Sequence, residues 1–187
     1  MLKVSCWSDM FFDQKPEDAV KIFSDNGFEV MELAIGAGAE LLARSKNVEK
    51  TGRDFKRYMD DLGFSAPQGH LKLECDICED DPTALLDELK AWIELYREAG
   101  VKKMVFHSGG FNKTLTSDER LERRANAIRQ LLPLIEGSDC VLCLENLVTI
   151  IPSSAELVKT IETIGSDNLG ICWDVGHLNL TKTYSVL

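Results

Sequence analysis

The alternation of apolar and polar positions along the chain predicts strands that alternate with helices. Short apolar runs, each long enough for a buried strand, lie at about 3–7, 29–34, 64–70, 102–107, 140–145 and 169–174. The segments between these runs carry apolar residues at every third or fourth position, which is typical of helices that pack on one face. Strands and helices in this order indicate an α/β fold in which helical crossovers join the strands of a parallel sheet.

Glycines recur at nearly regular intervals, and each one closes a predicted helix. The five are Gly27, Gly63, Gly100, Gly137 and Gly165. Glycine is common directly after a helix because it adopts the left-handed conformation there without steric cost. The repeat predicts a series of strand–loop–helix units, and no linker or low-complexity tract divides them. We therefore expect a single domain over residues 1–187.

Several helix boundaries and one buried helix face can be predicted from individual residues. In the helix before the fifth strand, Ser117 or Asp118 suits the N-cap, and Pro133 should kink the last turns. A weaker helix is expected over 51–62. The helix before the fourth strand has an apolar stripe made of Leu85, Leu86, Leu89, Trp92, Ile93 and Tyr96.

Composition and charge narrow the class of protein. The 187 residues are 44% hydrophobic and 28% charged, which is ordinary for a globular domain, and the net charge is −10. An acidic surface repels a phosphate backbone, so nucleic acid is not expected as a partner. The chain has no run of 18 apolar residues and no apolar signal segment after Met1, which predicts a cytosolic protein without a membrane span.

The six cysteines do not indicate a disulfide framework, because no signal for secretion accompanies them. Four of them lie within apolar, strand-like runs, where a free cysteine packs as a small hydrophobic residue. Cys75 and Cys78 form a CxxC pattern, but no second CxxC is present. We interpret these two as thiols without a chemical role, with a redox or metal function as the alternative.

Chemistry-bearing side chains stand where the predicted strands end. The third strand ends at His70, the fourth at His107, the fifth at Glu145 and the sixth at Asp174, with His177 three positions further on. The carboxyl ends of parallel strands share one face, which carries the active site in such folds. Three of these residues also have a structural interpretation: His70 could cap a loop, His107 could complete a turn, and Asp174 could N-cap the segment that follows it.

These side chains together suit a divalent metal ion. A buried charge costs several kcal/mol unless it is paired or metal-bound. Carboxylates from two strands together with imidazoles favour manganese, zinc, iron or cobalt over calcium. Within the Asp174–His177 pair, one residue could ligate the ion while the other orients a ligand or substrate. Trp7 and the "SDMFF" loop could form a wall of the pocket, although simple core packing would also explain Trp7.

Two motifs carry a resemblance to a known family. "LENL" at 144–147 and "CWDVGH" at 172–177 resemble the xylose isomerase-like TIM barrels, which include isomerases and epimerases of sugars and sugar phosphates as well as endonuclease IV. The resemblance follows the whole chain in order and implies a (β/α)8 barrel. This chain would supply about the first six βα units and be incomplete at its C-terminus. The family's strand-seven histidine and strand-eight glutamate have no counterpart here.

The resemblance also implies roles for individual residues. Glu145 would be both a metal ligand and the acid/base, Asp174 a metal ligand, and His177 a contact to the substrate. In the nuclease branch, histidines at the positions of His70 and His107 bind zinc as well. These two histidines and Trp7 are further candidates for contacts to the substrate. The implied cofactor is a divalent ion, with manganese, cobalt or zinc as the candidates.

The expected function is a metal-dependent isomerase or epimerase that removes a proton next to the carbonyl of a sugar or sugar phosphate. One alternative is an incomplete, non-catalytic protein that acts through association, because open sheet edges invite pairing. For the same reason we expect a homo-oligomer or pairing with a remaining part of the barrel. A DNA-repair nuclease resembling endonuclease IV is the other alternative, and the net charge of −10 disfavours it.

Overall fold

A six-stranded parallel sheet forms the centre of the protein. The computed structural model describes residues 3–73, 75–148 and 152–180. The strands follow one another in sequence order, and each pairs in parallel with its neighbours. They are β1 (Cys6–Trp7), β2 (Val30–Leu33), β3 (Ser65–His70), β4 (Lys103–Phe106), β5 (Val141–Glu145) and β6 (Leu169–Cys172). The predicted α/β fold, six consecutive βα units of a TIM barrel, is confirmed.

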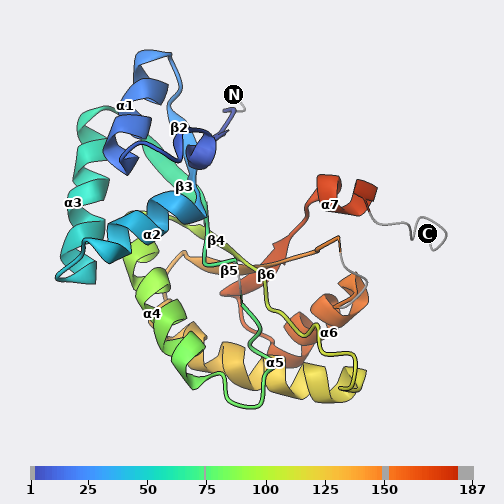
Figure 1. Ribbon diagram of the computed structural model, residues 1–187. Helices are drawn as coiled ribbons and strands as arrows, with labels where there is room; N and C mark the ends of the chain where they lie inside the picture. The colour runs from blue at the N-terminus through green and yellow to red at the C-terminus, as the bar shows by residue number, and fades with distance from the viewer. Residues whose placement is uncertain (1–2, 74, 149–151, 181–187) are drawn as a thin grey trace.

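Helices follow the strands and cover the outer side of the sheet (Figure 1). The α-helices are α1 (Pro16–Asp25), α2 (Ile35–Ala43), α3 (Val48–Asp61), α4 (Thr83–Glu98), α5 (Ser117–Leu131), α6 (Ser154–Ile164) and α7 (Val175–Leu180). Two short 3-10 helices are η1 (Ser8–Phe11) and η2 (Leu132–Leu134). The repeat glycines close these helices as predicted. Gly165, for example, follows α6 directly with a φ of 65°.

Some boundaries differ from the sequence prediction. The first strand is shorter than 3–7, because β2 pairs with it only at Cys6 and Trp7. The N-cap of α5 is Thr116, whose side chain forms a capping box with Glu119, so neither Ser117 nor Asp118 takes this role. Pro133 behaves as predicted, since the helix tightens into η2 at that point.

Helix α2 was not predicted, and its formation depends on residues distant in the sequence. Asp9, in η1 directly after β1, accepts hydrogen bonds from the backbone N–H groups of Gly36 at 2.8 Å and Ala37 at 3.2 Å. A Cβ atom at Gly38 would lie 2.4 Å from both Trp92 and the Tyr96 hydroxyl oxygen. The absence of a side chain at Gly38 therefore lets α2 approach α4 closely.

The apolar core lies between the sheet and its outer helices. From α4, the buried side chains are Leu86, Leu89, Trp92, Ile93, Leu95 and Tyr96, so the predicted stripe is confirmed except that Leu85 is only partly buried and Leu95 joins it. Tyr96 also has a polar role, because its buried hydroxyl lies within 3.3 Å of the carbonyl oxygens of Leu33, Ala34 and His70. Helix α4 thereby helps to fix the C-terminal ends of β2 and β3.

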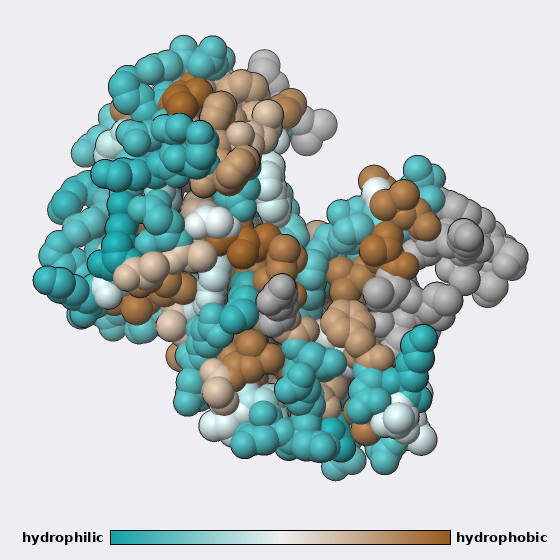
Figure 2. All heavy atoms as spheres, viewed as in Figure 1, coloured by the Kyte–Doolittle hydropathy of each residue, from teal (hydrophilic) through white to brown (hydrophobic). Residues whose placement is uncertain are grey.

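The sheet has two open edges within the described residues. There, β1 pairs only with β2, and β6 pairs only with β5. Large apolar side chains are exposed beside the β6 edge, among them Ile171, Trp173 and Val175. Figure 2 shows hydrophobic surface over the region of β6 and α7. Among the described helices, none combines the length and the hydropathy that crossing a membrane would require.

Candidate functional site

Glu145 lies at the centre of a cluster of side chains at the C-terminal edge of the sheet. It is the last residue of β5 and only 3% exposed. Its Oε2 atom lies 2.6 Å from His107 Nε2 and 3.2 Å from His70 Nε2. His70 ends β3 and His107 directly follows β4, so three adjacent parallel strands bring these side chains to the same edge.

Asp174 and His177 approach Glu145 from the neighbouring strand. Both follow β6, and His177 Nδ1 lies 3.6 Å from Glu145 Oε1 and 3.7 Å from Asp174 Oδ2. Within the described residues, two groups have potential ligand atoms all within 4.8 Å of one another. One group is His70, His107 and Glu145, and the other is Glu145, Asp174 and His177. The structure thus brings all five strand-end residues together around Glu145.

Asp174 has a structural contact as well. Its Oδ1 atom accepts the backbone N–H of His177 at 2.7 Å, so Asp174 caps α7 as the alternative interpretation allowed. The second oxygen, Oδ2, is the one that faces the His177 ring. One carboxylate therefore holds the start of α7 and still presents an oxygen atom to the cluster.

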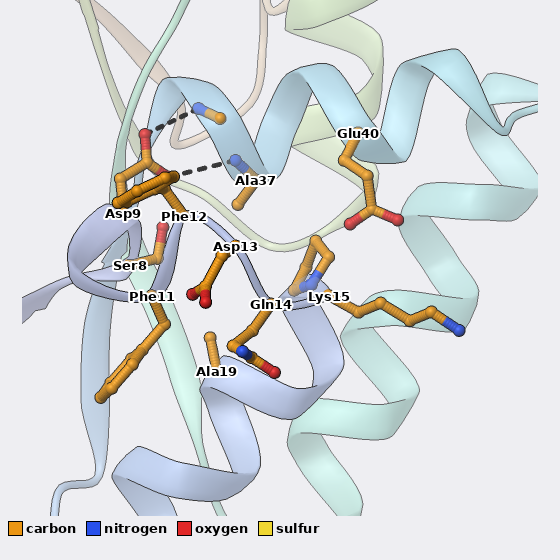
Figure 3. Close-up of a pocket in the computed structure, with 12 residues that line it drawn as sticks. Ser8, Asp9, Phe11, Phe12, Asp13, Gln14, Lys15, Ala19, Ala37 and Glu40 are labelled. Carbon is orange, nitrogen blue, oxygen red and sulfur yellow. Dashed lines mark hydrogen bonds between the residues drawn. The ribbon is translucent and has the colours of Figure 1, made fainter.

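Trp7 lies beside this cluster and contacts it. The centroid of its ring is 5.0 Å from that of His70, in an edge-to-face arrangement, and the side chain is half-buried. The "SDMFF" loop that follows is placed differently. Its residues Ser8, Asp9, Phe11 and Phe12 line a cavity of about 240 Å³ between η1, α1 and α2 (Figure 3). None of the strand-end residues lines that cavity, so the wall that the loop could form beside the cluster stays a prediction.

Two residues of the cluster were missed by sequence reasoning. Glu32, in β2, hydrogen-bonds to His70 Nδ1 on the side opposite Glu145. A glutamate within the apolar run "VMELAI" was the available signal. Asn146 follows Glu145, and its buried side chain binds the backbone of Asp174. Its place in "LENL" was the signal there.

The cluster is electrostatically paired. Burial disfavours a charged Glu145, but hydrogen bonds and charges from His107 and His70 outweigh it and hold the pKa of this carboxyl at about 2. Burial likewise opposes the charge on His70, yet Glu145 and Glu32 raise the pKa of this imidazole to about 9. At neutral pH the cluster therefore contains an ionised carboxylate, the form that a metal ligand or a general base requires.

Cys75 and Cys78 lie outside the cluster and are buried. Burial raises the pKa of the Cys75 thiol to about 12 and that of the Cys78 thiol to about 11. Because the thiolate is the reactive form, both side chains are poor nucleophiles. All six cysteines are free, which fits the interpretation of these residues as packing groups.

Solved structures of two sugar epimerases and of a protein with a bound zinc atom share this fold. D-psicose 3-epimerase from Clostridium cellulolyticum H10, with D-tagatose, superposes with a TM-score of 0.77 at 15% identity, over 99% of this chain and 67% of that one. For 3-keto-D-glucoside 4-epimerase from E. coli the TM-score is 0.76 at 17% identity, over 98% and 72%. The IOLI protein with a bound zinc atom superposes with a TM-score of 0.72 at 14% identity, over 94% of this chain and 64% of that one. The chain thus spans about two thirds of their length.

Sequence comparison gives the family more directly. No curated protein matches the sequence. A family model described as xylose isomerase-like TIM barrel, however, matches residues 20–185, which is most of the chain and includes His70, His107, Glu145 and Asp174. At identities of 14–17%, the solved structures show only that the chain shares their fold, which agrees with the family model. The chain therefore belongs to the xylose isomerase-like TIM barrel family.

Proposed function

We propose that this chain carries the metal-binding, proton-transferring site of a sugar or sugar phosphate isomerase or epimerase. The observation that carries the proposal is the buried carboxylate of Glu145 at the C-terminal edge of a parallel sheet, surrounded by His70, His107, Asp174 and His177. The substrate class is suggested by the epimerases of D-psicose and of a 3-keto-D-glucoside that share the fold. The net charge of −10 keeps a nuclease function disfavoured.

The donor atoms of the cluster suit a divalent ion. Metal–ligand bonds of about 2 Å allow two ligand atoms to lie at most about 4 Å apart, which is close to the spacing within the cluster. Oxygen and imidazole donors favour manganese, cobalt or zinc. Glu145 and Asp174 would hold the ion, with His107 and His70 as further candidate ligands. When bound, such an ion polarises a carbonyl or hydroxyl oxygen of the substrate.

Glu145 is the proposed general base. A carboxylate oxygen takes the proton from the carbon next to the substrate carbonyl, and the electrons of the broken C–H bond move into an enolate. An isomerisation is complete when the hydroxyl proton moves to the former carbonyl oxygen and Glu145 returns its proton to the former carbonyl carbon. An epimerisation is complete when a second proton donor on the opposite face protonates the carbon that lost its proton, while Glu145 keeps the proton it took. His177 and Trp7 lie beside Glu145 and His70, where they can orient the sugar.

His70 has both ring nitrogens occupied by carboxylates, Glu32 at Nδ1 and Glu145 at Nε2. This arrangement favours a role in holding Glu145 or in binding substrate over direct ligation of an ion. Among the described residues, the His107 ring makes one hydrogen bond, from Nε2 to Glu145. Because only one of its ring nitrogens faces a carboxylate, His107 is a better candidate for a metal ligand than His70.

Calorimetric titration tests the metal site. The purified chain should bind manganese, cobalt or zinc, and Glu145→Gln should weaken this binding by more than about 10-fold, the scale known for residues that only orient ligands. Glu162→Gln is the matched control, since Glu162 is an exposed glutamate on α6. Equal binding by Glu145→Gln and Glu162→Gln would contradict the assignment of Glu145.

Exchange of hydrogen with solvent tests the proton transfer. Ketoses, aldoses and their phosphates are incubated with the metal-loaded chain in D2O, and NMR follows deuterium at the carbon next to the carbonyl. We expect incorporation with the wild type and with Glu162→Gln, and none with Glu145→Gln. If the chain binds metal but incorporates deuterium into none of the sugars tested, the isomerase proposal is contradicted.

The open sheet edges favour a second candidate, association. Strands β1 and β6 each pair on one side only among the described residues, and Trp173 beside β6 is 55% exposed. An unpaired, apolar edge tends to recruit another strand. We propose that β1 and β6 are surfaces for protein contact, either with a second copy of the chain or with residues equivalent to the rest of a barrel.

A further inference from the structure

The side chain of Asn146 continues the β5–β6 ladder beyond its last backbone pair. The ladder ends where Glu145 faces Cys172. One residue further, Asn146 Nδ2 donates to the carbonyl of Asp174 at 2.8 Å, and Asn146 Oδ1 accepts the N–H of the same residue at 2.8 Å. A planar amide that carries a donor and an acceptor side by side reproduces the two bonds of a strand neighbour.

This contact matters because β6 is an edge strand. Within the described part of the chain, β5 is the one strand that pairs with β6, and Asp174 lies two residues beyond the end of β6. Asn146 is only 5% exposed, so both of its hydrogen bonds are shielded from competing water. The backbone of Asp174 is thereby held at a fixed distance from β5 and from Glu145.

Asn146 also determines the orientation of the His177 ring. His177 Nδ1 lies 2.9 Å from the Asn146 carbonyl oxygen, nearer than the carboxylates of Glu145 at 3.6 Å and Asp174 at 3.7 Å. A carbonyl can only accept, so Nδ1 carries the proton. The neutral ring then has its lone pair on Nε2. Nδ1 is consequently not the nitrogen that ligates an ion, and Nε2 can accept a hydrogen bond from a substrate hydroxyl.

We propose that Asn146 is a positioning residue that fixes Asp174 by its side chain and the tautomer of His177 by its carbonyl. It acts through these two residues and need not touch the substrate. The consequence for metal affinity rests on the proposed function, whereas the consequence for the His177 tautomer does not.

Asn168 provides a matched control at the opposite end of the same two strands. Its Nδ2 atom donates to the carbonyls of Cys140 at 2.7 Å and Ser138 at 3.1 Å, near the start of β5. Asn168→Ala therefore also removes side-chain hydrogen bonds between the β5 and β6 regions, but at the start of β5, at the opposite end of that strand from Glu145. Asn146→Ala removes both side-chain bonds to Asp174, and Asn146→Asp keeps the volume but loses the donor.

The first readout is the tautomer of His177, measured from the imidazole ¹⁵N shifts at alkaline pH. The chain has three histidines, so His70→Gln and His107→Gln spectra assign the signals. Both Asn146 variants keep the backbone carbonyl, but they weaken or remove the side-chain bonds that hold Asp174, and with it the start of α7, beside β5. His177 then loses its fixed place next to the Asn146 carbonyl. We therefore expect a protonated Nδ1 in the wild type and in Asn168→Ala, and a shift toward protonated Nε2 in both Asn146 variants. If Asn146→Ala does not fold, the isosteric Asn146→Asp supplies the comparison.

The second readout is cobalt affinity by calorimetry. Both Asn146 variants should bind cobalt about 10-fold more weakly than Asn168→Ala. A folded Asn146 variant with the wild-type tautomer and an affinity within about twofold of Asn168→Ala would overturn the inference. If the wild type binds no cobalt, manganese or zinc, the proposed function fails, and the tautomer comparison alone still decides the role of Asn146.

Discussion

Replacement of Gly38 by alanine sets helix propensity against packing, and the two effects predict opposite signs. Gly38 lies within α2, where alanine is favoured over glycine by about 1 kcal/mol. The added Cβ would, however, meet the buried Trp92 and the Tyr96 hydroxyl oxygen at 2.4 Å each. Contacts this short cannot persist, so α2 or the two aromatic side chains of α4 must move.

The magnitude follows from what moves. Overpacking of a buried site costs about 1–3 kcal/mol. Displacement of Tyr96 also weakens its bond to the His70 carbonyl, 2.8 Å long, at a cost of about 1 kcal/mol. After subtraction of the helix-propensity gain of about 1 kcal/mol, Gly38→Ala should destabilise the fold by about 2 kcal/mol.

Urea denaturation followed by circular dichroism measures the effect. With an m-value of about 2 kcal/mol/M, the midpoint should fall by about 1 M. Ala39→Gly is the matched control because Ala39 is exposed on the same helix, and it should lose only the propensity of about 1 kcal/mol. An unchanged or higher midpoint for Gly38→Ala would refute the close packing of α2 on α4.

Three further predictions concern other parts of the fold. Burial opposes the charge on Glu156, but the Ser153 N–H, Arg120 and Ser117 hold the pKa of its carboxyl at about 2, below the usual 4.5. The contribution of the ionised Glu156 to the free energy of unfolding should be complete above pH 4.5 and should fall as the pH drops from about 4.5 to 2. The stability gap between wild type and Glu156→Gln should therefore narrow from pH 6 to pH 3, and a constant gap would contradict this. Thr116→Ala should lower the free energy of unfolding by about 1 kcal/mol through loss of the α5 cap, which urea denaturation can check. Light scattering at micromolar concentration should show a dimer or larger species, and a monomer with a sharp thermal transition would count against association through β1 and β6.

Much of the candidate site could be predicted from the sequence because it depends on local order. Apolar runs and helix-closing glycines are local signals, and they predicted six strands alternating with helices, which favours a parallel sheet. Once the strands are parallel, residues at their carboxyl ends must meet at one edge. His70, His107, Glu145 and Asp174 could therefore be grouped before any coordinates were known, and they lie together.

Other features were decided by tertiary structure, since they depend on contacts between distant segments. Helix α2 lacks a strong local pattern and starts where Asp9, 27 residues before Gly36, accepts its first N–H groups. The pairing of Glu32 with His70 depends on the register of β2 against β3, which periodicity does not specify. The contact of Asn146 with Asp174 likewise requires β6 to lie beside β5 at one particular offset. Periodicity in the sequence thus determined which residues reach the edge of the sheet, whereas strand register and helix packing determined which of them touch.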